Sequence, residues 1–270
     1  YSSSDLLNWR YLNPLCVGRE DESGRMWNCP AFFPLDGQHV LVVSGQPVWK
    51  PFYMAGDFDG RHLTPRSEGL ADYGGNLYAP QVFIDEGGRA FLGGWIWEAR
   101  PDAEILAAGW AGVMGLPRVL SLNPDGSLAS HPAPEVETLR GARLGLPAQT
   151  LPGGDWPVPA LRGGSCELLA RFAPGGARRF GLRVFCAPDG SQHTSIGYDA
   201  EKREVFIDRS RAGLHPKMAF DWPNPTYHAA PLALEEAEPL ELRIFLDQSV
   251  IEVFTNRGLV FSSRVYPPQP

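Results

Sequence analysis

The segment Trp27-Asn28-Cys29-Pro30 brings an indole, an amide and a thiol together in four residues. An amide does not titrate, so Asn28 cannot donate a proton as a general acid. Cys29 has no histidine near it in the sequence, and we interpret it as a small buried hydrophobic residue rather than a nucleophile. Any site built on this segment therefore depends on shape and hydrogen bonding more than on proton transfer.

Motifs for other chemistry are missing from the rest of the chain. There is no GxSxG, P-loop, GxGxxG or HExxH motif. The four cysteines are scattered without CxxC spacing and the six histidines do not cluster, so we expect no disulfide framework, no metal site and no cofactor. The segment Asp57-Phe58-Asp59-Gly60 lacks the downstream ligands of a calcium loop, and we interpret it as a turn between strands.

The composition predicts many short strands. Glycine (30) and proline (26) make up about a fifth of the 270 residues, and both interrupt helices and favour turns. Hydrophobic residues make up 43% of the chain and are spread along it, which excludes a disordered protein.

The charge pattern excludes two classes of partner. The net charge is −7 and no basic patch is interleaved with aromatic residues, so we expect no nucleic acid. No apolar run approaches the roughly 18 residues of a membrane helix, and no signal-peptide pattern follows Tyr1. We therefore expect a soluble protein, either cytoplasmic or secreted; the sequence does not decide between the two, nor does it give the oligomeric state.

The C-terminal third predicts a β-meander. Leu240, Leu242, Ile244 and Leu246 alternate with mostly polar residues, which is the period of a strand. Turn residues follow at 247–249 and 256–258, with further strands between and after them. Additional short strands are predicted at 166–172, 182–187, 194–198 and 204–208, a pattern typical of a β-sandwich or barrel.

The N-terminal half is predicted to consist of propeller blades. Its apolar runs are brief (31–33, 40–43, 81–84 and 90–97), and each is bounded by Gly, Pro or Asp. The stretch 140–164 is rich in Gly and Pro and separates the two halves. We therefore divide the chain into a partial β-propeller domain, residues 1–145, and a β-sandwich domain, residues 160–270.

Several motifs, in order along the whole chain, resemble one family. They are Met26-Trp27-Asn28-Cys29-Pro30, Gly56-Asp57-Phe58-Asp59-Gly60, Asp72 to Gln81, Gly94-Trp95, Gly109-Trp110-Ala111-Gly112 with Leu116-Pro117-Arg118, and Ser263-Arg264-Val265-Tyr266-Pro267. This order is similar to that of glycoside hydrolase family 32, the β-fructosidases. The resemblance implies a five-bladed β-propeller followed by a β-sandwich, and retaining hydrolysis of β-fructofuranosidic bonds.

The resemblance also implies a site. Retaining hydrolysis needs two carboxyl groups about 5 Å apart, one as nucleophile and one as acid and base. The acid/base glutamate of the family corresponds to Asn28, and the resemblance places Trp27, Cys29, Asn76, Tyr78 and Trp95 around the substrate. The expected partner is a small-molecule or oligomeric fructoside. Arg118 and Trp110 are interpreted as structural.

The chain departs from the family pattern at charged positions. Besides Asn28, Ala31 and Asn76 stand where aspartates are usual. No segment matches the nucleophile segment Asn-Asp-Pro-Asn-Gly: Asn123-Pro124-Asp125-Gly126 is interpreted as a tight turn, and Asp221-Trp222-Pro223-Asn224 lies in the other half. We expect the nucleophile, with roughly the first two blades, to lie before Tyr1.

Three interpretations follow from these departures. The protein is a β-fructosidase seen as a partial chain, a catalytically impaired carbohydrate-binding relative, or a fragment with no site.

Overall fold

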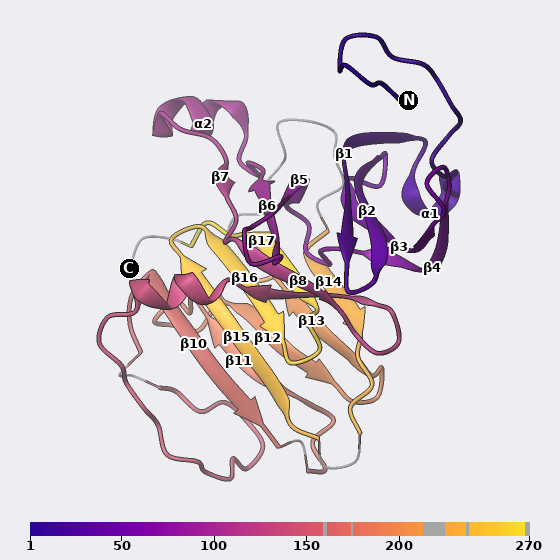
Figure 1. The fold of residues 1–270 in the computed structure, drawn as a ribbon. Coiled ribbons are helices and arrows are strands. Elements are labelled where there is room, and N and C mark those ends of the chain that lie inside the picture. The colour runs from indigo at the N-terminus through magenta and orange to yellow at the C-terminus, as the bar shows by residue number, and fades with distance from the viewer. Residues whose placement is uncertain (159–160, 174, 213–224, 236–237, 268–270) are drawn as a thin grey trace.

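The computed structural model describes residues 1–158, 161–173, 175–212, 225–235 and 238–267. The chain is all-β, with four antiparallel sheets and only short helices (Figure 1). Asp221 to Asn224 lie outside the described residues. Among the described residues, no helix has both the length and the apolar character needed to cross a membrane.

Two sheets come from the first half of the chain. The first has the consecutive order β1-β2-β3-β4, and the second is β5-β6-β8-β9 with the short β7 paired to β6. Consecutive antiparallel strands in sheets of this size are typical of propeller blades. The bounds are β1 Met26–Leu35, β2 Gln38–Gln46, β3 Lys50–Phe58, β4 Leu63–Leu70, β5 Leu77–Ile84, β6 Ala90–Ile96, β7 Val113–Met114, β8 Arg118–Leu122 and β9 Leu128–Pro132.

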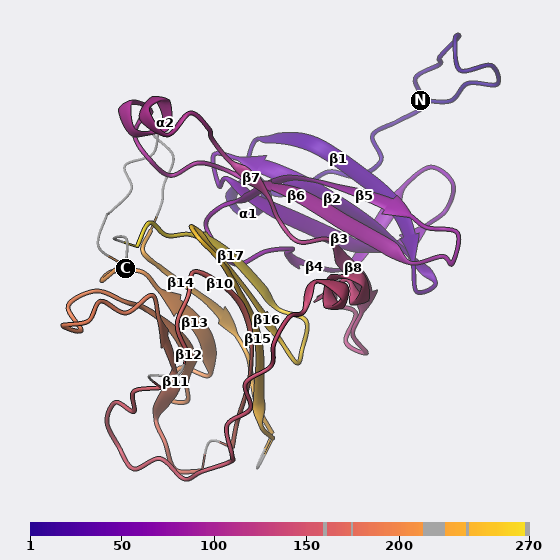
Figure 2. The same cartoon turned by 90° about the vertical axis from the view of Figure 1, so that its left-hand side faces the viewer.

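The other two sheets come from the second half and face each other (Figure 2). One has the order β10-β15-β16-β17 and the other β11-β12-β13-β14. The bounds are β10 Ser165–Phe172, β11 Arg179–Val184, β12 Thr194–Asp199, β13 Glu204–Asp208, β14 Tyr227–Pro231, β15 Leu240–Asp247, β16 Val250–Thr255 and β17 Val260–Arg264. The helical segments are α1 Glu20–Ser23, α2 Asp102–Ala108 and the 3-10 turn η1 Pro134–Leu139.

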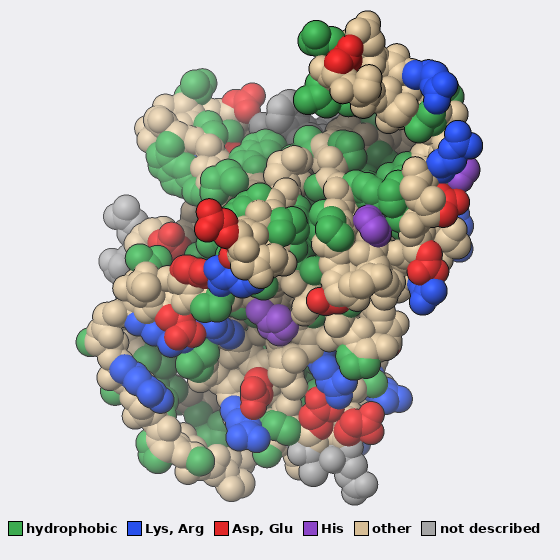
Figure 3. Space-filling view, in the orientation of Figure 1, with side chains coloured by type: hydrophobic (Ala, Val, Ile, Leu, Met, Phe, Trp, Pro, Cys, Tyr) green, Lys and Arg blue, Asp and Glu red, His purple; other side chains and the backbone are tan. Residues whose placement is uncertain are grey.

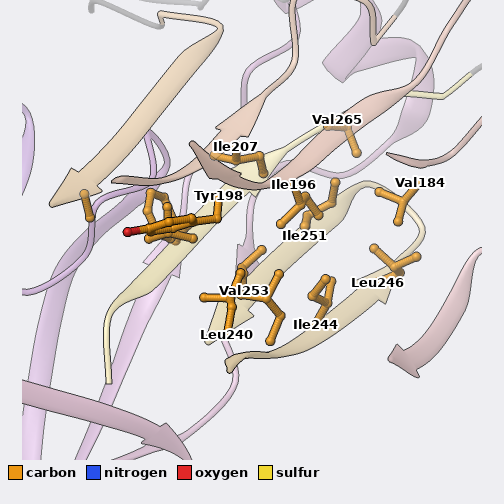
Figure 4. Packing of buried hydrophobic residues seen from close by; sticks show 14 of the residues in the cluster. Val184, Ile196, Tyr198, Ile207, Leu240, Ile244, Leu246, Ile251, Val253 and Val265 are labelled. Atoms are coloured by element: carbon orange, nitrogen blue, oxygen red, sulfur yellow. The ribbon is translucent and has the colours of Figure 1, made fainter. Parts of the chain in front are cut away.

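The meander prediction is confirmed, and its period of two explains the packing. Leu240, Leu242, Ile244 and Leu246 of β15 are buried, while Glu241 is exposed. The buried side chains meet Ile196 and Ile207 of the facing sheet in one core (Figure 4). Side chains that alternate along a strand point to opposite faces, so one apolar row is enough to join the sheets.

Strand β16 is buried on both of its faces. Ile251 and Val253 belong to the core between the paired sheets, whereas Val250 joins a second core that also contains Leu77 and Leu120 of the β5 sheet. The β10-β15-β16-β17 sheet therefore lies between its paired sheet and the β5 sheet. A strand covered on both faces is mostly apolar, as in the run Val250 to Phe254, in which the one charged residue, Glu252, is paired with Arg118.

Several boundaries differ from the sequence prediction, with local causes. The strand expected at 182–187 lies at Arg179–Val184, because Phe185 has a positive φ of 52° and ends it. β4 was not predicted, since it is polar and contains Pro65; it is an edge strand, where proline is tolerated.

Two segments interpreted as turns are confirmed as turns. The Asp59 carboxylate accepts hydrogen bonds from the backbone N–H of Arg61 and of His62, both at 2.7 Å, between β3 and β4. Asn123 and Ser127 close the turn between β8 and β9 through a backbone bond of 2.8 Å.

Gly74, in the segment before β5, lies close to the backbone of β17. A Cβ atom at this position would lie 2.1 Å from the carbonyl oxygen and 2.4 Å from the nitrogen of Ser262. The neighbouring backbones hydrogen-bond here, from Tyr73 to Val260 at 2.8 Å and from Asn76 to Ser262 at 3.2 Å.

We expect Gly74→Ala to lower the free energy of unfolding by about 2–3 kcal/mol, because backbone must move to admit the methyl group. Denaturant unfolding of the purified protein measures this. The control is Gly93→Ala, also in the β5 sheet, where a Cβ atom would have no neighbour within 4 Å. The control should stay within about 1 kcal/mol of wild type, and equal losses in both variants would contradict the close approach.

Candidate functional site

The first strands of the two N-terminal sheets share the same backbone irregularity. Cys29 in β1 and Ala79 in β5 have positive φ angles of 51° and 48°, and each is followed by a proline. The register of each strand shifts at this point, between Asn28 and Ala31 in one sheet and between Tyr78 and Gln81 in the other. Non-glycine residues in this conformation and bulges at strand starts are both enriched at functional sites.

The residues before these bulges meet. The Asn28 side-chain amide donates a hydrogen bond of 3.1 Å to the hydroxyl of Tyr78, and the Gln46 amide donates a second one of 3.3 Å. Ser44 links the same two sheets, because its Oγ accepts a 3.0 Å hydrogen bond from the backbone N–H of Ala79. The structure therefore brings together Asn28 and Tyr78, two of the predicted site residues.

An aromatic cluster surrounds Tyr78. The rings of Tyr78 and Trp97 are stacked, with centroids 5.8 Å apart and an angle of 10° between their planes. Trp49 lies 5.8 Å from Tyr78 and 6.3 Å from Trp97. Trp49, Tyr78 and Trp97 are called the aromatic cluster below. Trp97 is buried and Trp49 is half-buried, so Trp49 presents the cluster to solvent.

Sequence reasoning missed Gln46, Trp49 and Trp97 as site residues. Trp49 has a positive φ of 57°, which is strained for a bulky side chain. No sequence signal places the turn between β2 and β3 beside β5, since this contact depends on how the two sheets pack.

Trp95 and Cys29 lie at the margin of this arrangement. Trp95 is opposite Tyr78 in the β5–β6 pair and 38% exposed. The prediction that Cys29 is buried is wrong: Cys29 is exposed, at the bulge of β1. Its carbonyl accepts a 3.3 Å hydrogen bond from the Gln81 amide. In Figure 3, hydrophobic side chains gather on the face formed by β5, β6, β7 and α2. Met114, which pairs with Trp95, is 70% exposed on this part of the molecule.

Trp27 does not contact Asn28 through its side chain. It packs with Leu41 and Met54 in the core on the face of the first sheet that lies away from the β5 sheet. Its indole N–H donates a 3.3 Å hydrogen bond to the hydroxyl of Ser23. Its role as a substrate contact remains a prediction from the resemblance.

Asn76 is fully buried where the β5 sheet meets β17. Its side-chain oxygen accepts a 2.9 Å hydrogen bond from the backbone N–H of Arg264 and a longer one, 3.4 Å, from Arg209. Its Nδ2 has no hydrogen-bond partner among the described residues. In this structure Asn76 joins the sheets two residues away from Tyr78 and is not itself part of the aromatic cluster.

Glu98 follows Trp97 and is the centre of a buried polar network. It accepts hydrogen bonds from Arg100 at 2.7 Å, from Arg264 at 3.0 Å and from the hydroxyl of Tyr266. Burial opposes the charged form, but the bonds from Arg100 and Tyr266 and the charge of Arg264 outweigh it and lower the pKa of Glu98 to about 2. Arg100 also lies over the ring of Trp110, 4.3 Å from its centroid.

A second buried network surrounds Arg118, in agreement with a structural role. Its guanidinium donates to Asp72 and to Glu252, each at 2.8 Å, and is fully buried. The two carboxylates raise the pKa of Arg118 in spite of its burial, so this side chain stays charged.

The Glu98 network predicts a pH dependence of stability. A carboxyl group whose pKa falls from 4.5 to about 2 on folding adds stability above pH 4.5, and this is lost as the pH falls toward 2. We expect wild type to exceed Glu98→Gln by about 2–3 kcal/mol in unfolding free energy at pH 7, and the difference to shrink steadily below about pH 4.5.

Urea unfolding at several pH values measures this difference. The control is Glu241→Gln, because Glu241 forms an exposed ion pair with Arg171 at 3.3 Å. Exposed pairs contribute about 0–1 kcal/mol, so this control should follow wild type at every pH. A pH-independent gap between Glu98→Gln and wild type would refute the assignment of charge to Glu98.

The described residues contain no group of three or more His, Cys, Asp or Glu side chains arranged to hold a metal ion. One hollow of about 360 Å³ is lined by Leu15, Cys16, His62 and Leu63 among others, and no residue of the aromatic cluster lines it. The site therefore consists of amides and aromatic rings, with Tyr78 and Trp97 buried and Asn28 and Trp49 half-buried.

Comparison with known families identifies the class of protein. The family description "Glycosyl hydrolases family 32 N-terminal domain" matches residues 1–132, and "Glycosyl hydrolases family 32 C terminal" matches residues 135–270. The chain belongs to glycosyl hydrolase family 32.

Curated relatives that match the chain include two bacterial hydrolases. A sucrose-6-phosphate hydrolase of Staphylococcus xylosus is 28% identical over 98% of this chain and 54% of its own length. A levanase of Bacillus subtilis is 31% identical over 96% of this chain and 41% of its own length. The chain thus spans about half the length of the curated relatives it matches.

Solved structures share the fold. Fructan 1-exohydrolase IIa of Cichorium intybus superposes with a TM-score of 0.83 at 22% identity, covering 98% of this chain and 60% of that one. Sucrose-6-phosphate hydrolase of Lactobacillus gasseri gives a TM-score of 0.81 at 24% identity, with 98% and 55% covered. These likenesses agree with an all-β, propeller-like arrangement.

Proposed function

We propose that the protein binds β-fructosides, with the terminal fructofuranosyl unit of sucrose or a fructan at the face formed by Asn28 and the aromatic cluster. The observation that carries the proposal is the 3.1 Å hydrogen bond between Asn28 and Tyr78, which come from separate family motifs. The names of the relatives support this ligand class, since they name hydrolases of sucrose 6-phosphate, levan and fructan.

The arrangement suits a neutral sugar. Amide groups of Asn28 and Gln46 supply hydrogen bonds, and Trp49 supplies an apolar ring face at the solvent side of the cluster. Sites for small polar ligands commonly combine aromatic walls with a few fixed polar groups.

The reaction proposed for the whole protein is retaining hydrolysis of β-fructosyl bonds. It requires a nucleophilic carboxylate and a second carboxyl group that first protonates the leaving oxygen and then activates water. In this chain the position of that second group is Asn28, which can hydrogen-bond the leaving oxygen but cannot transfer a proton. General acid–base catalysis is worth about 10²–10⁴ in rate, so we propose that hydrolysis by this chain is impaired.

The same proposal extends to the architecture. We propose that the two N-terminal sheets belong to a five-bladed propeller domain, residues 1–145, and the paired sheets to a β-sandwich domain, residues 160–270. The common core of the paired sheets supports the second assignment.

Titration of the purified protein with sucrose and with fructose tests binding. We expect a saturable change in tryptophan fluorescence, because Trp49 and Trp97 lie next to the proposed sugar position. Trp49→Phe should remove most of the change. Trp156→Phe is the matched control, since Trp156 is 51% exposed on the segment before β10 and should leave the change intact. No saturable signal in the wild-type protein would refute the proposal.

A second candidate function, binding without hydrolysis, is favoured by Asn28. We expect Asn28→Glu to leave sucrose hydrolysis unmeasurable in this chain, because no segment of its sequence matches the nucleophile. Release of reducing sugar measures this, with Asn28→Gln as the uncharged control of equal length. Appreciable hydrolysis by Asn28→Glu alone would overturn the placement of the site.

A further inference from the structure

Arg264, at the end of β17, contacts both segments that lead to the aromatic cluster. Its backbone N–H donates to the side chain of Asn76 at 2.9 Å, and its guanidinium donates to Glu98 at 3.0 Å. Asn76 precedes Tyr78 by two residues and Glu98 directly follows Trp97. Arg264 is therefore hydrogen-bonded to a residue close in sequence to each of the two stacked rings.

The segment before Tyr78 and the segment around Trp97 are also hydrogen-bonded to each other. The backbone N–H of Trp97 donates a 3.0 Å hydrogen bond to the carbonyl of Asn76, and the Trp97 indole N–H donates a 2.9 Å hydrogen bond to the carbonyl of Gly75. A shift of β17 would consequently move the backbone of Asn76 and Glu98 together. The rings of Tyr78 and Trp97 are stacked within 10° of parallel, so such a shift would also change the position of the Tyr78 ring relative to Asn28.

The guanidinium of Arg264 has little freedom to move. It is fully buried, and the centroids of the Trp110 and Tyr266 rings each lie 5.3 Å from its Cζ atom. Its Nε donates a 3.1 Å hydrogen bond to the hydroxyl of Tyr266, which in turn donates to Glu98. Because a buried ion pair often adds little net stability, a role for Arg264 in fixing the conformation of its neighbours can be tested separately from its effect on stability.

We propose that Arg264 is a positioning residue: through Asn76 and Glu98 it sets the pose of Tyr78 and Trp97 for fructoside binding. The inference rests on the proposed function for its ligand. The second half of the chain then takes part in the site by supporting it. Among the described contacts, no side chain of β17 belongs to the aromatic cluster.

Arg118 provides a matched control within the same interface. It is an equally buried arginine and also joins the β5 sheet to the β10-β15-β16-β17 sheet, through Asp72 and Glu252. Its hydrogen bonds involve neither Asn76 nor Glu98. Loss of either arginine side chain removes a buried ion pair, but only loss of the Arg264 side chain frees Glu98, the residue next to Trp97; the backbone bond from Arg264 to Asn76 is kept.

The experiment compares Arg264→Met, Arg264→Lys and Arg118→Met with wild type. Thermal unfolding reports stability, sucrose titration by tryptophan fluorescence reports the Kd, and near-ultraviolet circular dichroism reports the aromatic packing without any ligand. Both Met variants should unfold at lower temperature. Arg264→Met should raise the Kd for sucrose about tenfold and weaken the near-ultraviolet signal, while Arg118→Met keeps both near wild type at temperatures where it is folded.

Arg264→Lys retains the charge beside Glu98 and should show the same changes to a smaller extent. If Arg264→Met does not fold, the comparison is made with Arg264→Lys. Equal Kd values and spectra for the Arg264 variants and Arg118→Met would overturn the inference. Absence of sucrose binding by wild type would instead refute the proposed function, and the spectra alone would then decide whether Arg264 positions the aromatic rings.

Discussion

The fully buried guanidinium of Arg118, held between the carboxylates of Asp72 and Glu252, is the contact on which the arrangement of the sheets depends. A charge without solvent is tolerated only with partners in good geometry, so β8 and β16, which carry Arg118 and Glu252, must meet the segment before β5, which carries Asp72, in one arrangement. The β5 sheet and the β10-β15-β16-β17 sheet are therefore fixed relative to each other, while the segments that lead to Tyr78 and Trp97 are bound separately, through Arg264.

The sequence predicts well the features that arise within one strand or turn. The alternation from Leu240 to Leu246 gives β15 and its buried face, and Asp59 and Asn123 mark turns through their local hydrogen bonds. It fails for β4, because an edge strand needs no apolar alternation. It also misplaces the end of β11, where the backbone of Phe185 leaves the extended region for reasons that lie in the packing.

The candidate site could be predicted in part for the same reason. Asn28 and Tyr78 were found because ordered motifs identify their strands, and the structure joins them by a hydrogen bond. Gln46, Trp49 and Trp97 could not be found, since their proximity follows from the packing of two sheets. The ionic networks of Glu98 and Arg118 link residues more than 130 positions apart, and no local pattern encodes such pairings.

The exposed edge at β4 has a consequence for the behaviour of the protein in crowded solution. A free strand edge can pair with a strand of another molecule and begin aggregation. In β4 the side chains of Thr64, Pro65 and Arg66 are exposed, and Arg66 forms an ion pair with Asp57 of the neighbouring strand. A proline and a charge on the outermost strand make a poor template for a strand of another molecule. The polar sequence of β4, which gives no strand signal, therefore also protects the sheet from self-association.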